Sequence, residues 1–490
     1  MPLPPMFACV PRPPAPLFHR SVWAGWLSLL LLAPALAEPL PPEVDAALRR
    51  AKLPGSALAA VVQEAGTGQR KLAWNETEPV NPASVFKLFT TYAALDLLGP
   101  AWTWNTPIYL SGTLQGGVLD GSVAVRGSGD PKLVVERLWL MLRRLQQMGV
   151  KEIRGDVLLD RSAFQVPEVA PGEFDGDATR PYNVRPDALL LNLKSVIYTF
   201  TPDAARGLAT VSAEPALAGV AVDATVPLSS GPCDDWRGAL KGQVGEVTRV
   251  HFGGAFPAAC GEKVWPVAFA DARGYNARLI EQLWREMGGK LGGKVRDGAV
   301  PAGARLAFDN PSPALAEVVR DINKYSNNVM AEQLFLSLPA AVRGAGTGPT
   351  RPEDARDALR RWVQERYGDA AAKETVIDNG SGLSRETRVS AQLLARLLQN
   401  AWGSPVMSEL MSSLPVSGLD GTLKRSKTEP GRAHLKTGSL RDVAAVAGYV
   451  LSNSGKRYVL VAVLNHPNAN AGRPALDALV QWAIRDAPQK

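Results

Sequence analysis

Two side chains in the first hundred residues have the types and spacing of a nucleophile and its base. Ser84 stands three residues before Lys87, which is the only lysine in the chain with a serine at that distance. Residues three apart share one face of a helix, so the amine can reach the hydroxyl. A serine without a histidine partner needs such a base to become nucleophilic. The pair predicts covalent catalysis, and the alternative is a helix start with a solvated lysine.

A second motif, Ser326-Asn327-Asn328, lies 242 residues further on. Ser326 is the only serine followed two positions later by asparagine. Its hydroxyl could relay a proton to a leaving group, and the Asn328 amide could hold a substrate peptide bond. An ordinary helix cap is the alternative, because serine and asparagine are common at helix starts.

The third motif is Lys436-Thr437-Gly438. Lys436 and Thr437 could bind a carboxylate, and Gly438 would let a ligand backbone approach a strand edge. The Ser439 N–H could complete an oxyanion hole with the Ser84 N–H. For this motif alone, an exposed edge lysine beside a glycine is the alternative. The occurrence of all three motifs in one order favours the catalytic interpretation.

The first motif requires a helix start. Asn81 can cap a helix, Pro82 suits its first position, and Gly99 would end it. Ser84 then lies in the first turn, where the partial positive charge of the helix N-terminus would favour an oxyanion.

The other two motifs require a helix junction and a strand. Apolar spacing predicts helices over about 313–324 and 328–338, so the second motif lies at their junction. Residues two apart do not share a helix face, so only such a junction brings Ser326 and Asn328 together. Strands are predicted over 434–440, 444–452 and 456–464.

The spacing of the motifs predicts a long insert. The first two are 242 residues apart and the last two 110, and a single core has no room for the longer interval. We expect an α/β (α+β) domain, an antiparallel sheet with helices on both faces, formed by residues 38–106 and 303–490. A helix over 41–51, a hairpin over 56–74 and a closing helix over 473–485 belong to it.

The insert, 107–302, is predicted to be mostly β and to hold one or two lobes. Its predicted strands are 108–111, 123–126, 157–160, 209–212 and 220–224, and its predicted helices are 131–148 and 272–287.

Residues 1–37 have the pattern of a secretory signal peptide. Arg12 and Arg20 precede an apolar run over 22–32, and Ala35-Leu36-Ala37 forms a cleavage site. No later apolar stretch approaches the length of a membrane span, so the mature protein is expected to be soluble after export, without a transmembrane anchor.

Composition excludes several classes of partner and cofactor. The formal charge of +7 falls to +5 without the leader, and its basic residues are interspersed with acidic ones, so no nucleic acid is expected. There are four histidines and no H-E-x-x-H zinc motif, so no metal is expected, and no other cofactor is expected either. The absence of a G-x-S-x-G motif disfavours a rival serine-hydrolase scheme. Cys233 and Cys260 remain after export and predict a disulfide, with two buried thiols as the alternative.

Together the three motifs resemble the S-x-x-K, S-x-N and K-T-G set of penicillin-binding proteins and serine β-lactamases. The long insert is similar to that of the class C low-molecular-mass penicillin-binding proteins. These are D-alanyl-D-alanine carboxypeptidase/endopeptidases of the penicillin-binding protein 4 type, serine peptidase family S13. The resemblance covers essentially the whole mature chain. Further segments that resemble the family are 127–131, 378–383 and 414–423.

The resemblance implies roles for the motif residues. Ser84 would attack the carbonyl between two D-amino acids and form an acyl-enzyme that water cleaves. Lys87 would be the base, neutral because burial and nearby Lys436 disfavour its charge. Ser326 would relay a proton to the leaving amine, Asn328 would hold the substrate, and Lys436 would give electrostatic support.

The family also implies substrates and a location. We expect a periplasmic enzyme that acts on peptidoglycan stem peptides and their cross-links and is acylated by β-lactams, with a homodimer left open. The insert should bring one acidic residue to the site. Asp177 fits this place best, and Asp175 is the near alternative. The non-functional alternative is that Asp177 only caps or closes a turn. A serine β-lactamase or esterase and a catalytically silent wall-binding protein are the alternative functions.

Overall fold

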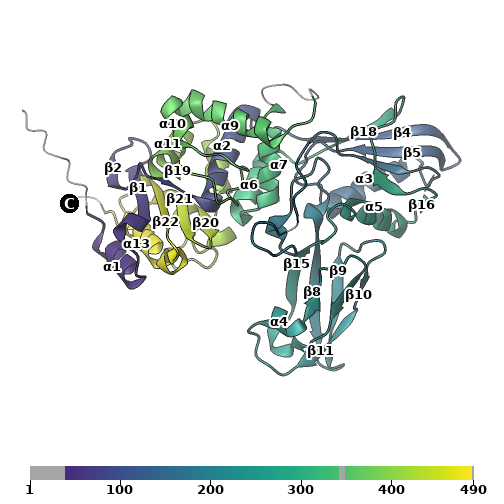
Figure 1. Cartoon of the computed structure of the whole chain (residues 1–490), viewed down its shortest axis with the longest axis horizontal. Coiled ribbons are helices and arrows are strands. Elements are labelled where there is room, and N and C mark those ends of the chain that lie inside the picture. Colours follow the sequence, from purple (N-terminus) through teal and green to yellow (C-terminus); the bar gives the residue numbers. More distant parts are fainter. Residues whose placement is uncertain (1–38, 171, 341–347, 488–490) are drawn as a thin grey trace, which may run out of the picture. The chain divides into compact units, whose positions relative to one another are not determined.

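The computed structural model of the protein describes residues 39–170, 172–340 and 348–487 (Figure 1). The predicted signal peptide lies outside these residues. Within them, no helix has the length and apolar character needed to cross a membrane.

The three motifs are arranged around an antiparallel five-stranded sheet with the order β2-β1-β22-β21-β20 (Figure 1). Strand β1 pairs with β22, so the two ends of the chain build one sheet. This agrees with the antiparallel sheet predicted from the sequence. The strands are β1 (Leu58–Glu64), β2 (Arg70–Trp74), β20 (Ala433–Leu440), β21 (Val443–Leu451) and β22 (Arg457–Asn465).

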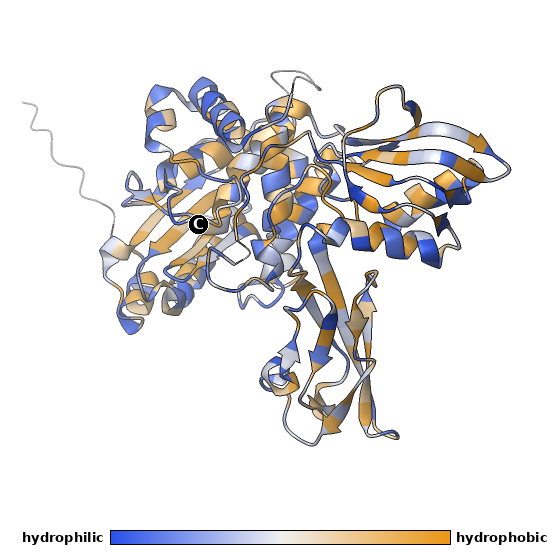
Figure 2. Ribbon diagram, turned by 45° about the vertical axis from the view of Figure 1, so that its right-hand side comes forward, coloured by the Kyte–Doolittle hydropathy of each residue, from blue (hydrophilic) through white to orange (hydrophobic). Residues whose placement is uncertain are grey.

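Both faces of this sheet are covered because its strands are apolar at successive positions, which point to opposite sides. Strand β22 contributes Val461 and Val463 to one core and Leu460 and Leu464 to the other. Figure 2 shows these strands as nearly continuous apolar ribbon. Helices α1 (Pro42–Arg50) and α13 (Arg473–Ile484) cover the second core.

A larger set of helices covers the first core and carries two of the motifs. These helices are α2 (Lys87–Leu98), α6 (Leu315–Tyr325), α7 (Asn328–Ser337), α9 (Pro352–Tyr367), α10 (Asp369–Glu374), α11 (Ala391–Trp402) and α12 (Met407–Ser413). A short pair of strands, β3 (Pro79–Val80) and β19 (Val389–Ser390), lies beside them.

The inserted region contains a seven-stranded sheet, with helices α3 (Val135–Gln147) and α5 (Tyr275–Glu286) contributing to its apolar core. Strands β4 and β18 pair from Asn105 with Pro311 to Leu110 with Arg305. The sheet therefore begins two residues before and ends nine residues after the expected range 107–302. The strands are β4 (Asn105–Gln115), β5 (Val118–Arg126), β6 (Glu152–Ile153), β7 (Val157–Asp160), β16 (Lys290–Leu291), β17 (Val295–Asp297) and β18 (Arg305–Pro311).

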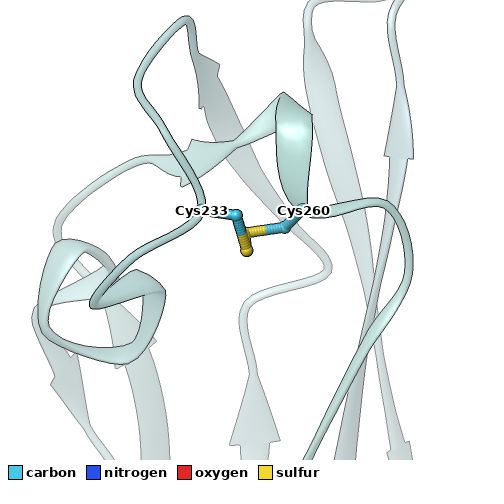
Figure 3. The surroundings of a disulfide bond; sticks show 2 residues. All are labelled: Cys233 and Cys260. Carbon is cyan, nitrogen blue, oxygen red and sulfur yellow. A yellow bond between two sulfur atoms is a disulfide. The ribbon is translucent and has the colours of Figure 1, made fainter.

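A second group of strands in the insert forms a five-stranded and a three-stranded sheet. Here Cys233 and Cys260 are joined by a disulfide beside α4 (Trp236–Leu240) (Figure 3). The strands are β8 (Ser195–Asp203), β9 (Leu208–Glu214), β10 (Ala221–Val222), β11 (Thr225–Ser229), β12 (Gly242–Gln243), β13 (Arg249–Phe252), β14 (Phe256–Pro257) and β15 (Lys263–Ala268).

Candidate active site

The three motifs meet in one cleft of about 860 Å³. Ser84, Ser326, Asn328, Thr437 and Ser439 line it. Segments hundreds of residues apart in the chain thus present hydroxyl and amide groups to a common space, while the two motif lysines lie buried behind its wall.

Ser84 lies on a strained turn in front of α2, not inside the regular helix that the sequence predicts. The turn is a 3₁₀ segment, η2 (Ala83–Phe86), and α2 begins directly after it at Lys87. Ala83 has a φ of 46°, in the left-handed region that a non-glycine residue seldom adopts. The Asn81 side chain accepts the Ala83 N–H at 2.9 Å, so Asn81 stabilises the turn instead of capping the helix.

Two glycines allow this turn to pack closely against its neighbours. A Cβ on Gly382 would lie 2.0 Å from the Ala83 carbonyl oxygen, and one on Gly438 would lie 2.6 Å from the Pro82 carbonyl oxygen. The sequence interpretation assigned the space at Gly438 to a ligand backbone. The structure corrects this: the nucleophile turn itself occupies that space.

The Lys87 amine is held by three groups. Its Nζ lies 2.9 Å from the Ser84 Oγ, 2.7 Å from the Asn328 Oδ1 and 2.6 Å from the Ser381 carbonyl oxygen. Burial, followed by the positive charge of Lys436, holds the pKa of Lys87 well below its usual range, and Glu332 opposes them. A neutral amine has two protons for the two carbonyl oxygens and one lone pair for the Ser84 hydroxyl. This geometry suits a base.

The Lys436 amine makes a second serine–lysine pair. Its Nζ donates to the Ser326 Oγ at 2.8 Å and to the Thr437 carbonyl oxygen at 2.8 Å. The side chain is fully buried, and burial lowers the pKa of Lys436 to about 7. Ser326 ends α6 with a φ of 57°, and its hydroxyl faces the cleft from that sharp junction.

Asn328 joins the catalytic lysine to the insert. Asn327, and not Asn328, caps α7 by accepting the Met330 N–H. The Asn328 amide is therefore free for the site, where its Oδ1 accepts from Lys87 and its Nδ2 donates to the Tyr182 carbonyl oxygen at 3.1 Å. One amide proton remains for a substrate carbonyl group.

The strand side of the cleft presents hydroxyl and cationic groups. The Thr437 Oγ1 donates to the Thr422 Oγ1 at 2.8 Å, and the Ser439 Oγ accepts from the Arg473 guanidinium. Strand β20 is the last strand of its sheet, so alternate N–H groups along it do not bond to β21. An anionic group bound here would meet hydroxyls, N–H groups and a guanidinium.

The structure corrects the assignment of Asp177 to the cleft. The Asp177 carboxylate accepts the Thr179 N–H and hydroxyl and pairs with Arg180 at 2.7 Å, so it closes a local turn. Among the described residues, Asp175 lines the cleft and Asp177 does not.

Asp175 is held ionised at the cleft surface. Tyr182 donates to its carboxylate at 2.6 Å and Asn183 at 2.7 Å. Burial opposes the ionised form, but these two hydrogen bonds outweigh it and lower the pKa of Asp175 below its usual range. Asp175, the alternative to Asp177 in the sequence analysis, is therefore the one of these two aspartates that lines the cleft.

Sequence reasoning missed three residues at the site: Ser381, which accepts from Lys87; Arg473, which donates to Ser439; and Glu332, which accepts from Ser381. Ser381 belongs to the segment 378–383, which resembles the family, so a signal was present. Glu332 is the one acidic residue of α7, one turn after Asn328. Arg473 carried no signal, because its contact with Ser439 depends on where α13 begins.

The fold and the site define a class: serine hydrolases with a serine–lysine pair, as in penicillin-binding proteins. Residues 40–486 match the D-Ala-D-Ala carboxypeptidase 3 (S13) family, and the chain belongs to that family. The family and the enzyme class predicted from the motifs, a serine-type D-Ala-D-Ala carboxypeptidase, are thereby confirmed.

Relatives match along most of the chain. It is 27% identical to a D-alanyl-D-alanine carboxypeptidase of Actinomadura sp. (strain R39), over 94% of this chain and 90% of the relative. It is 26% identical to the D-alanyl-D-alanine carboxypeptidase DacB of Haemophilus influenzae, over 84% and 86%. The crystal structure of penicillin binding protein 4 (dacB) from Haemophilus influenzae matches with a TM-score of 0.69 at 23% identity, covering 89% of this chain and 99% of that one. This likeness confirms the predicted fold class.

Proposed function

We propose that the protein is an exported, periplasmic DD-peptidase of peptidoglycan that acts through an acyl-enzyme at Ser84. It removes the last D-alanine of stem peptides and cleaves D-alanyl–diamino-acid cross-links between them. The observation that carries the proposal is the contact between the Lys87 amine and the Ser84 hydroxyl, made by a buried amine whose pKa is lowered.

The chemistry divides into acylation and deacylation. The Ser84 oxygen attacks the D-alanyl carbonyl carbon while its proton passes to the Lys87 amine. The N–H groups of Ser84 and Ser439 stabilise the oxyanion of the tetrahedral intermediate. The C–N bond then breaks, and the leaving amine takes a proton from the Lys436 ammonium through the Ser326 hydroxyl. In a second step water attacks the ester and gives up a proton through Ser326 to Lys436, while the Lys87 ammonium returns its proton to the Ser84 oxygen and regenerates the hydroxyl.

The cleft fits both ends of such a substrate. On the strand side, Thr437 and Ser439 would bind the carboxylate of a terminal D-alanine, assisted by Arg473, while buried Lys436 would add positive charge from behind them. On the insert side, Asp175 would pair with the side-chain amine of a diamino acid, a residue that precedes the D-alanine pair in many stem peptides.

Inhibition by β-lactams belongs to the same proposal, because a β-lactam presents a strained amide and a carboxylate to the same groups. The penicillin binding protein 4 (dacB) from Haemophilus influenzae has been crystallised complexed with a β-lactam. The cleft residues that contact Ser84 directly would serve both in the cleavage of peptides and in acylation by a β-lactam.

A time course with fluorescent penicillin, resolved on a denaturing gel, tests this function. We expect a covalent band that persists for many minutes in the wild type and is missing in Ser84→Ala. A band that forms and disappears within seconds would indicate the alternative serine β-lactamase. No band at any time would indicate a catalytically silent wall-binding protein.

A further inference from the structure

A buried carboxyl group lies beside the catalytic lysine and has no role in the steps above. Glu332 is on α7, four residues after Asn328, so both side chains lie on the same helix face. Its side chain is only 5% exposed. A buried carboxyl group is costly unless it is paired or hydrogen-bonded, so its surroundings identify what it serves.

Ser381 connects Glu332 to Lys87. The Ser381 hydroxyl lies 3.0 Å from the Glu332 Oε1, and the Ser381 carbonyl oxygen accepts from the Lys87 Nζ at 2.6 Å. The same hydroxyl lies 2.9 Å from the Asn379 Oδ1. One hydroxyl proton thus has two acceptors. Ionised Glu332 accepts the hydrogen bond from the Ser381 hydroxyl, whereas protonated Glu332 donates a hydrogen bond to the Ser381 oxygen, and the hydroxyl then donates to Asn379.

Charged groups from four parts of the fold face this pair. Burial raises the pKa of Glu332 to about 7, while the positive charges of Arg185, from the insert, and of Lys87 oppose the rise and Asp378 adds to it. Lys87 in turn faces Lys436 on β20. The charge on Glu332 can therefore change near neutral pH.

We propose that Glu332 is a positioning residue for Lys87, which holds the Ser381 carbonyl oxygen against the amine and supplies negative charge to the ammonium formed during acylation. In that step the Ser84 O–H bond breaks and an N–H bond forms on Lys87. The freed electron pair of the Ser84 oxygen bonds to the substrate carbonyl carbon. The proton stays on Lys87, and none moves to Glu332. This inference rests on the proposed function of Ser84 and Lys87.

Glu332→Gln tests the proposal, because glutamine keeps the size and the hydrogen bond and removes only the charge. The acylation rate constant would be measured by stopped flow with a chromogenic cephalosporin between pH 5 and 9. We expect the maximal rate to fall about tenfold, as for one lost charge-assisted contact. We also expect the acid limb of the profile to move to lower pH by about half a unit or more, because the charge that favours protonated Lys87 is gone.

Ser381→Ala provides a second, independent variant that keeps the carbonyl contact with Lys87. Without its hydroxyl the Glu332 carboxylate loses a hydrogen bond and stays protonated over a wider range. The acid limb should move in the same direction as in Glu332→Gln. This variant tests the proposal even where the glutamine variant does not fold.

Glu374→Gln is the matched control, since the Glu374 carboxylate also accepts from a serine hydroxyl, that of Ser390 at 2.7 Å. We expect this variant to have the acylation rate of the wild type and the same limbs in its pH profile. An acid limb at the wild-type pH in folded Glu332→Gln or in Ser381→Ala would overturn the proposal and leave Glu332 a purely structural group. Failure of the proposed function would instead appear as no acylation of the wild type.

Discussion

The Lys436 amine donates a hydrogen bond to the Ser326 hydroxyl at 2.8 Å, and the Lys87 amine lies 2.9 Å from the Ser84 hydroxyl. The site therefore contains two serine–lysine pairs, and both amines are fully buried. Each pair can conduct one proton transfer, the first toward acylation and the second toward the leaving amine. Burying two amines together lowers the free energy of unfolding. Replacing one of them should therefore change stability and reaction rate in opposite directions.

Lys436→Met should stabilise the fold and impair the reaction. Burial in the folded state disfavours the Lys436 ammonium, and its pKa therefore falls from 10.5 to about 7. That penalty on the free energy of unfolding is complete below about pH 7 and disappears as the pH rises toward 10.5. Urea unfolding at pH 6 should therefore show a gain of roughly 1–3 kcal/mol, with a smaller gain at pH 10. Acylation by penicillin should slow by about 100-fold or more.

Lys424→Met, at an exposed lysine near the cleft, is the control for that experiment. Its free energy of unfolding should change by no more than about 0.5 kcal/mol. If Lys436→Met is less stable than the wild type at pH 6, the hydrogen bonds of Lys436 outweigh its burial and this account of the amine is wrong.

The acylation rate should pass through a maximum with pH, because the productive state has Lys87 neutral and Lys436 charged. Protonation of Lys87 lowers the rate on the acid side, and loss of the Lys436 proton lowers it on the alkaline side. The two amines interact, so the limbs report apparent pKa values of the pair. In Lys436→Arg the charge persists at alkaline pH, and the alkaline limb should move up by about one unit or more. Identical alkaline limbs in the two proteins would contradict this assignment.

Asp175→Asn should reduce kcat/KM about tenfold for a stem peptide with a free side-chain amine, since it removes one charge-assisted contact. Asp177→Asn is the matched control and should change this value little, because its carboxylate serves the local turn with Thr179 and Arg180. Penicillin, which lacks the amine, should acylate both variants at the wild-type rate. A larger loss in Asp177→Asn than in Asp175→Asn would reinstate the sequence-based assignment.

The Cys233–Cys260 bridge should contribute to stability without affecting the chemistry. It closes a loop with a sequence separation of 27 residues, for which the chain-entropy model predicts roughly 3–4 kcal/mol. The double variant Cys233→Ser/Cys260→Ser should lose about that much in urea unfolding and keep its acylation rate. Peptide mapping of exported protein under non-reducing conditions should recover the two cysteines linked, and recovery of two free thiols would refute the prediction.

The strands and helices that carry the motifs could be predicted because their sequences are locally regular. Residues 434–440, 444–452 and 456–464 were expected as strands, and β20, β21 and β22 differ from them by about one residue at each end. The junction that holds Ser326 was predictable from apolar spacing alone. By contrast β14, only two residues long, forms through pairing with β11, about 28 residues earlier in the chain, which leaves no local pattern.

The finer geometry of the site depends on contacts between distant segments. The strained turn before Lys87 exists because Gly382 and Gly438, far along the chain, leave space for its carbonyl oxygens. Asp175 and Asp177 are two residues apart and chemically identical, so only the contacts of Tyr182 and Thr179 decide which carboxylate lines the cleft. Such choices are made by tertiary packing and cannot be read from composition or periodicity.

The central claim is that Ser84 is the nucleophile, and mass spectrometry of the penicillin adduct tests it most directly. The wild type, treated with benzylpenicillin and digested, should carry one penicilloyl group on the peptide that contains Ser84. Lys87→Ala should form the same adduct several orders of magnitude more slowly, and Ser84→Ala should form none. An adduct that maps to Ser326 or to any other residue, or one that persists in Ser84→Ala, would contradict the account.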